Sequence, residues 1–240
     1  MATTEEGRDR HRVRHLQGAF LLLMLVIAPV RAATTECGDP FVNHFGPFDY
    51  RTASAQDKAT VENVHFTAET EQLKPGAGTG DPGGDLGYTL RVFPNHPRAL
   101  LAMSRLAIRD KVAMPRSAKI TIDCYFDRAI RFRPDDFEVY LTYGIHLMRI
   151  GDAKGATVQF EKAAERNDAA ANVHYNLGLA YVQTKDYDKA LLHAQRAYAL
   201  GFPLPGLRNQ LEKAGKWQAP PPDAAGGNQE GTAVQGATAK

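Results

Sequence analysis

Apolar residues in the second half of the chain recur at intervals of three and four positions, the spacing that places them on one face of an α-helix. Residues 137–170 contain two such stretches, separated by the turn-forming dipeptide Gly151-Asp152. The pattern predicts two antiparallel helices joined by a short turn. The positions that define their facing sides are Tyr143, Gly144 and Leu147 in the first stretch and Ala156, Phe160 and Ala163 in the second.

The same arrangement returns in residues 171–204. Gly144 is matched by Gly178, and Ala163 by Ala197. A fixed period of this length is typical of stacked helical repeats. Glycine inside a helix costs about 1 kcal/mol relative to alanine, so a glycine that recurs at one phase predicts close packing against a neighbouring helix.

These stretches resemble the tetratricopeptide repeat family. The residues that carry the resemblance are YGIHL (143–147) with AxxxFxxA (156–163), and NLGLAY (176–181) with AxxxAxxA (190–197). The resemblance implies an all-α fold, a short right-handed superhelical array of helix pairs, and a role in protein interaction. The chain departs from the family pattern at Asp168, where the family favours proline, and at Ala194, which stands in the place of Phe160.

Weaker copies of the pattern extend the array in both directions. The expected units are a degenerate half repeat (84–96), an enlarged repeat (97–136) with an insertion at 111–117, two regular repeats (137–170 and 171–204) and a capping helix that ends the repeat domain (84–216). A terminal helix of this kind covers the apolar face that the last repeat would otherwise expose.

The segments on either side of the repeats lack this periodicity. Residues 33–83 are rich in glycine, proline and aromatic residues. We expect an irregular segment that packs on the repeats, with an extended piece or short strand at 61–66 and a helical turn at 69–74. The glycine-rich run 75–87 has no Gly-Lys-Ser/Thr, so it is interpreted as a flexible loop rather than a phosphate-binding one. Residues 219–240 hold almost no large apolar side chain, which predicts that residues 217–240 form a disordered Pro/Gly/Ala tail.

Residues 1–32 have the order of a secretory signal peptide. Four arginines between positions 8 and 14 precede an apolar run, Leu16–Val30, and small residues then allow cleavage after Ala32. The run is shorter than the roughly 20 residues that span a bilayer, although an uncleaved anchor is the alternative. We therefore predict an exported protein of the periplasm or cell envelope that contacts the membrane only through this segment before cleavage.

Removal of residues 1–32 takes away five of the 29 basic and three of the 27 acidic residues, which leaves 24 of each. A neutral chain lacks the concentrated positive surface of a nucleic-acid-binding protein, so no nucleic-acid partner is expected. The two cysteines, Cys37 and Cys124, can form one disulfide in an oxidising compartment. Two unpaired thiols are the alternative.

No constellation of catalytic residues stands out. In the chain after residues 1–32, no pair of histidines or cysteines has the spacing of a metal site, and the sequence has no Gly-x-Ser-x-Gly motif. We therefore expect a protein that is not an enzyme and has no metal and no cofactor. An enzymatic interpretation would require His44, Asp49, His65 and Asp85 to gather at one place.

Stacked helix pairs offer a concave surface lined by the first helix of each pair. The outward positions on these helices mix arginine, asparagine, tyrosine and aliphatic side chains, which suits an extended peptide. The candidate groove residues are Arg98, Leu101, Arg105, Arg109, Leu141, Ile145, Arg149, Asn172, Tyr175, Asn176 and Leu179. The alternative is a groove filled by the chain's own N-terminal segment, with the aromatic run 41–50 lying in it.

The sequence thus favours a non-catalytic scaffold of the cell envelope that binds a protein or peptide of unknown identity through this groove. A second hypothesis is a small-molecule or glycan-binding accessory subunit of an envelope enzyme or transport system, with a pocket built by the N-terminal aromatics.

Overall fold

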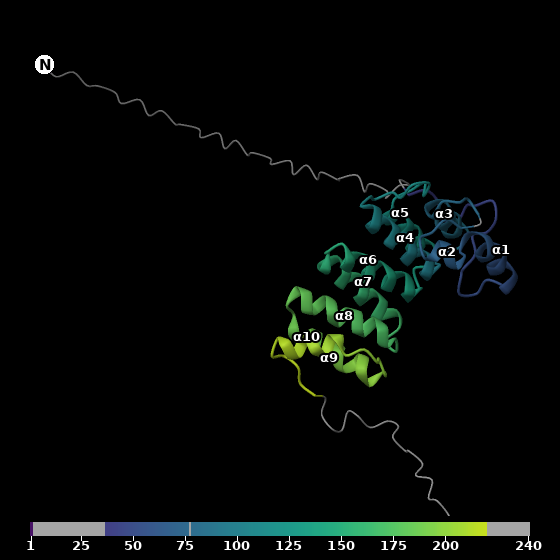
Figure 1. Ribbon diagram of the computed structural model, residues 1–240. Coiled ribbons are helices and arrows are strands. Elements are labelled where there is room, and N and C mark those ends of the chain that lie inside the picture. Colours follow the sequence, from purple (N-terminus) through teal and green to yellow (C-terminus); the bar gives the residue numbers. More distant parts are fainter. Residues whose placement is uncertain (2–36, 77, 220–240) are drawn as a thin grey trace, which may run out of the picture. The chain divides into compact units, whose positions relative to one another are not determined.

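The computed structural model describes residues 1, 37–76 and 78–219, and every regular element in these residues is a helix (Figure 1). The predicted signal peptide and residues 220–240 of the predicted tail lie outside them. The helices are α1 (Ala55–His65), α2 (Ala68–Glu71), α3 (Pro82–Val92), α4 (Pro97–Asp110), α5 (Ile122–Phe132), α6 (Phe137–Arg149), α7 (Ala153–Arg166), α8 (Ala171–Thr184), α9 (Tyr187–Ala199) and α10 (Gly206–Lys213). The predicted all-α fold is confirmed. None of the described helices combines the length and the apolar character needed to cross a membrane.

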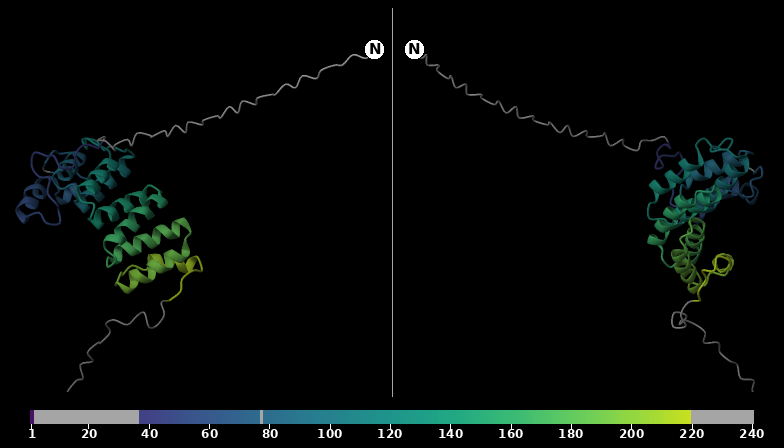
Figure 2. Two further views of the ribbon diagram at one scale, coloured as in Figure 1. Left: turned by 180° about the vertical axis from the view of Figure 1, so that it is seen from behind. Right: turned by 90° about the vertical axis from the view of Figure 1, so that its left-hand side faces the viewer.

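Helices α4 to α9 form three consecutive pairs that fall within the predicted repeats. Helix α6 packs against α7, α8 packs against α9, and α7 joins these two pairs by packing against α8. Figure 2 shows the pairs stacked in chain order. The loop between α4 and α5 contains the predicted insertion, and α3, which packs on α4, corresponds to the half repeat.

Aspartates fix the starts of three repeat helices. Asp136, Asp152 and Asp186 each accept a hydrogen bond from a backbone N–H in the first turn of the helix that follows. Such a cap satisfies an N–H group that has no partner within the helix. Helix α8 begins at Ala170 without a side-chain cap. The nearby Asp168 instead forms an ion pair with Arg196 of α9, at 2.6 Å between Oδ2 and Nη2.

The two recurring glycines allow close helix packing, but each has a different neighbour. A Cβ atom added to Gly144 would lie 2.4 Å from Cε1 of Phe160, which is fully buried in α7. At Gly178 the added atom would lie 2.4 Å from Cδ2 of Leu207 in α10. Because Ala194 replaces the aromatic residue in the last repeat, the buried Leu207 side chain packs against this glycine instead.

Helix α10 continues the repeat period as a first helix without a second. Val139, Val173 and Leu207 occupy the same position in three successive periods, and all three are fully buried. Helix α10 packs on both α8 and α9. Beyond it, the ring of Trp217 packs edge-on against Tyr198, with centroids 5.9 Å apart, so the first residues of the predicted tail contact the last repeat.

The prediction of an irregular segment at 33–83 is wrong at α1 and α2, and the prediction of a flexible loop at 75–87 is wrong from Pro82 onward, where α3 begins. Of residues 61–66, expected to be extended, 61–65 form the end of α1 and Phe66 is its C-cap. Ser54 caps the start of this helix by accepting a hydrogen bond from the Asp57 N–H. Only Val61 is fully buried in this helix. Since one buried residue makes no periodic apolar stripe, the hydrophobic pattern gave no sign of the helix. The expected helical turn at 69–74 overlaps α2.

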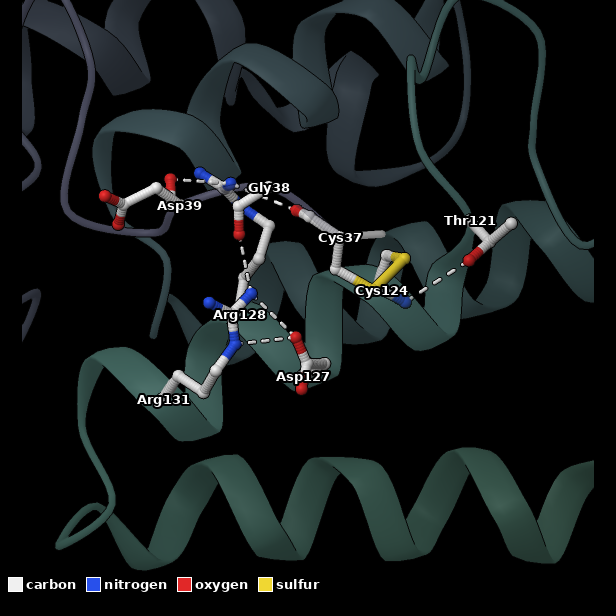
Figure 3. Close-up of a disulfide and its surroundings, with 8 residues drawn as sticks. All are labelled: Cys37, Gly38, Asp39, Thr121, Cys124, Asp127, Arg128 and Arg131. Atoms are coloured by element: carbon white, nitrogen blue, oxygen red, sulfur yellow. Dashed lines mark hydrogen bonds and ion pairs between the residues drawn. A yellow bond between two sulfur atoms is a disulfide. The ribbon is translucent and has the colours of Figure 1, made fainter. Parts of the chain in front are cut away.

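Residues 37–50 lie as an irregular strap along the ends of α3 and α5. Cys37 and Cys124 are joined by a disulfide, and Arg128 and Arg131 of α5 donate hydrogen bonds to backbone carbonyls of residues 37–39 (Figure 3). The aromatic side chains of the strap continue the contact. Their partners are Phe132 for Phe41, Phe93 for Phe48, and Phe93 and His96 for Tyr50.

Candidate interaction face

The candidate groove residues lie on α4, α6 and α8, the first helices of the three pairs. Helix α4 contacts α6, and α6 contacts α8. We call the set of groove residues predicted above the first-helix face. The structure divides this face into a section on α4, which the chain itself covers, and a section on α6 and α8, parts of which remain exposed.

Three arginines of α4 hold the chain's own residues 71–73. Arg98 donates two hydrogen bonds to the Glu71 carboxylate, one of 2.9 Å from Nε to Oε1. Arg105 donates from Nη2 to the Glu71 carbonyl at 2.5 Å, and Arg109 from Nη1 to the Leu73 carbonyl at 3.0 Å. The bonds from Arg98 lower the pKa of the Glu71 carboxyl. The α4 section of the groove is therefore filled by the chain itself, as the alternative prediction held. The segment that fills it is the end of α2 and the residues after it, not the aromatic run 41–50.

The aromatic run 41–50 does not lie on these arginines. Its rings pack at the ends of α3 and α5, as described above. An open cleft of about 390 Å³ remains beside the covered section, lined by Glu71, Gln72, Leu73 and Arg105. A ligand could thus reach Arg105 without removing the whole segment.

On α6, the predicted residues differ in accessibility. Leu141 is only 6% exposed and belongs to the core with Val173, so its placement in an open groove is wrong. Ile145 is half-buried, and Arg149 is exposed. Arg149 forms no ion pair within the described residues. Partial burial, and then the like charge of Arg105, lower the pKa of its guanidinium.

On α8, the side chains of the face are only partly free. The ring of Tyr175 stacks on Phe202 with centroids 4.1 Å apart, so this tyrosine packs against the segment that leads into α10. Asn176 donates from Nδ2 to the carbonyl of the exposed Asn172 at 2.7 Å, which leaves its side-chain oxygen available as an acceptor. Leu179 is half-buried.

The four residues of the enzymatic interpretation do not gather at one place. His65 and Asp85 are hydrogen-bonded, with 2.9 Å between Nδ1 and Oδ1, at the N-terminal end of α3. Asp49 lies beyond the other end of that helix, where Asn95 donates to it. His44 is exposed on the strap. The described residues also contain no cluster of three or more His, Cys, Asp or Glu side chains that could hold a metal ion.

Sequence reasoning missed a buried polar junction between the strap and the repeats. The Asn95 amide donates to Asp49 at 2.7 Å and to Asp136 at 2.8 Å, while Arg133 donates to Asp49. Burial would raise the pKa of Asp49, but the hydrogen bonds from Arg51, Asn95 and Arg133 outweigh it and lower the pKa well below its usual value. The Pro-Asn and Pro-Asp pairs at the repeat boundaries were the only local signal.

A pair of histidines in the last repeat was also missed. Nδ1 of the buried His174 lies 3.0 Å from Nδ1 of His193, and its Nε2 lies 2.8 Å from the carbonyl of Asp168. Burial, followed by the charge of His174, lowers the pKa of His193 to about 4. Because the two histidines lie on different helices, far apart in sequence, they form no recognisable motif.

Comparison with known proteins supports the interpretation of the repeats. Residues 171–201, which cover α8 and α9, match the family model described as tetratricopeptide repeat. A stretch of 134 residues is 25% identical to Protein O-mannosyl-transferase TMTC3 of Homo sapiens, over 55% of this chain and 14% of that protein. The Mus musculus protein of the same name is 26% identical over 99 residues, 41% of this chain and 10% of that protein. The chain thus spans about a seventh or less of the length of these relatives. The family match at α8 and α9 and the stacked helix pairs together support tetratricopeptide repeats in this chain.

Proposed function

We propose that the chain is a non-catalytic scaffold that binds a protein or peptide through the first-helix face, chiefly through its section on α6 and α8. Tetratricopeptide repeats suggest an interaction scaffold. The observation that carries the proposal is the pair Arg105 and Arg149 on the neighbouring helices α4 and α6. Helices α4 and α6 contact each other, and partial burial, followed by the like charge of Arg105, lowers the pKa of Arg149. Arg149 has no acidic partner in the described residues. A carboxylate from a partner would relieve this repulsion and accept charge-assisted hydrogen bonds.

The surroundings of Arg149 suit a peptide that also carries apolar side chains. Ile145 on α6 and Leu179 on α8 are half-buried, so each still exposes apolar surface that a ligand can cover. The Asn176 side-chain oxygen can accept a hydrogen bond from a backbone N–H. Together these groups can bind an extended chain by its backbone, one acidic group and one or two aliphatic side chains.

We propose that the scaffold works outside the cytoplasm. The order of residues 1–32 favours export, and a Cys37–Cys124 disulfide is expected to persist in an oxidising compartment. Expression with a C-terminal tag, followed by fractionation and N-terminal sequencing, tests this. Cleavage after Ala32 is the expected result, and an intact N-terminus in the cytoplasmic fraction would refute it.

Affinity capture with the full chain as bait tests the binding proposal. The test variant Arg149→Ala/Leu179→Ala removes one cation and one aliphatic side chain from the face. The matched control Lys162→Ala/Val158→Ala removes similar groups from exposed positions on α7. A partner bound by the native chain and the control but lost by the test variant supports the proposal. Equal recovery by both variants would place the binding surface elsewhere.

A second candidate function is a glycan-binding accessory module. It is favoured by the name of the relatives, which refers to mannosyl transfer. Titration of the full chain with manno-oligosaccharides, followed by protein NMR, tests it directly. Shifts confined to residues near Tyr50 and Phe48 would support a pocket at the strap, and an unchanged spectrum would remove this candidate.

A further inference from the structure

Residues 71–73 contact α4 in the way a bound peptide would. The three arginines that hold them, at positions 98, 105 and 109, are spaced by seven and four positions, so they share one side of the helix. They contact one carboxylate, that of Glu71, and two backbone carbonyls. Only the carboxylate contact depends on the identity of the side chain. Residues 71–73 make these bonds as the end of α2 and the turn after it, and another segment with a carboxylate and free carbonyls could make bonds of the same kind.

The charged contacts of this segment are largely exposed to solvent, whereas Leu73 is partly buried against the core formed by α3, α4 and α5. The Arg98 side chain is 59% exposed and that of Glu71 is 27% exposed, and ion pairs of this kind contribute little in water. Leu73 adopts a left-handed backbone conformation with φ of 63°, which favours glycine over leucine. By contrast, arginines also hold residues 37–39 on α5, but there the Cys37–Cys124 disulfide adds a covalent bond. Residues 71–73 have no such bond.

The charges on the face exceed what the segment supplies. Glu71 offers its carboxylate to Arg98, and Asp110 of α4 pairs with Arg109 at 2.7 Å. Arg105 contacts only a backbone carbonyl of the segment, and Arg149 on the adjacent helix α6 adds a further positive charge. The cleft lined by Glu71, Gln72, Leu73 and Arg105 is open to solvent at this place. A segment with several carboxylates could therefore pair with Arg105 and Arg149, which have no acidic partner within the described residues, as well as with Arg98.

We infer that residues 71–73 are a replaceable occupant of the α4 section, and that an acidic, extended segment of the binding partner displaces them. This inference rests on the proposed function and names the chemistry of its partner. It also implies that the free chain covers part of its own binding face. The apparent affinity for an acidic segment is then reduced by the free energy needed to release Glu71 from Arg98.

The test uses a fluorescein-labelled hexaglutamate peptide and the full chain, with binding followed by fluorescence anisotropy. Glu71→Gln keeps the size of the side chain but removes its charge, and we expect it to strengthen binding about fivefold. Glu69→Gln is the matched control, because Glu69 is exposed on the same helix and makes no ion pair within the described residues. Addition of Arg98→Ala to Glu71→Gln should abolish the gain.

Hydrogen exchange supplies a second measurement that does not depend on the variants. The amides of Leu73 and Lys74 donate to the carbonyls of Thr70 and Glu69, so displacement of the segment should speed their exchange when the native chain is saturated with hexaglutamate. Equal affinities for the Glu71 and Glu69 variants, or unchanged exchange, would overturn the inference. Absence of hexaglutamate binding in every variant would also overturn it, whereas the capture experiment with Arg149→Ala/Leu179→Ala tests the proposed function independently.

Discussion

The substitution Gly144→Ala tests why a glycine recurs inside the first helix of each regular repeat. The new Cβ atom would lie 2.4, 2.5 and 2.8 Å from three ring carbons of Phe160. The ring is fully buried, so it cannot move aside without disturbing the core. Overpacking of this kind costs about 1–3 kcal/mol, and three close contacts place the cost near the upper end. The gain in helix propensity is about 1 kcal/mol, so we expect a net loss of about 1–2 kcal/mol.

Urea unfolding followed by circular dichroism measures this loss, and a double-mutant cycle assigns it to the contact. Phe160→Leu removes the ring edge that the new methyl group would meet. In that background Gly144→Ala should be neutral or stabilising by up to about 1 kcal/mol, which gives a coupling energy of about 2 kcal/mol. If Gly144→Ala stabilises the native chain instead, close packing is not the reason for the glycine.

The corresponding change at Gly178 provides a comparison within the same protein. There the added atom would meet a terminal methyl carbon of Leu207 and the Ala190 carbonyl oxygen at 3.4 Å. A leucine methyl group can rotate away more easily than a ring. We therefore expect Gly178→Ala to destabilise the chain less than Gly144→Ala does.

Three further predictions concern other parts of the array. Reduction of the Cys37–Cys124 disulfide should lower the free energy of unfolding by about 2–4 kcal/mol in urea titrations with and without reductant, and an unchanged midpoint would show that the bond does not restrict the unfolded chain. His193 has a pKa of about 4 in the folded chain, below its ordinary value of 6.5. The unfolded chain therefore binds a proton at this residue more readily, so the free energy of unfolding is unaffected above pH 6.5 and falls as the pH is lowered towards 4. Between pH 7 and pH 4.5 the free energy of unfolding, measured by urea titration, should fall by about 2 kcal/mol more in the native chain than in His193→Gln. Equal decreases in the two proteins would show that His193 does not cause this pH dependence. Leu207→Ala should cost about 2–5 kcal/mol because the side chain is fully buried against α8, and a thermal midpoint equal to that of the native chain would show that α10 does not stabilise the last repeat.

The sequence was informative where local pattern and packing coincide. The fixed repeat period predicted the helix pairs from α6 to α9, because each pair uses the same inward positions. The same period also reaches α10, where Leu207 occupies the position of Val139 and Val173, although α10 lacks the other residues of the repeat pattern. The sequence did not reveal that Leu207 would replace the missing ring at Gly178, since that contact joins different units of the array.

The covered part of the interaction face could not be predicted in the same way. The arginines of α4 were correctly expected to face outward from the core, but their partners are a carboxylate and two carbonyls from a segment that α3 separates from α4 in the sequence. Backbone carbonyls are present at every residue, so no residue type marks them as acceptors. Tyr175 was misleading for a related reason, since an amphipathic side chain can complete intramolecular packing as readily as it contacts a ligand.

The disulfide has a mechanical consequence. It closes a loop over a sequence separation of 87 residues, within which α1 to α4 lie. When the oxidised chain is pulled from both ends, tension passes from Cys37 directly to Cys124 and enters the array at α5. The backbone of α1 to α4, and with it residues 71–73, lies outside this covalent path of tension. Reduction would return them to the path of the force and release up to about 300 Å of additional extended chain.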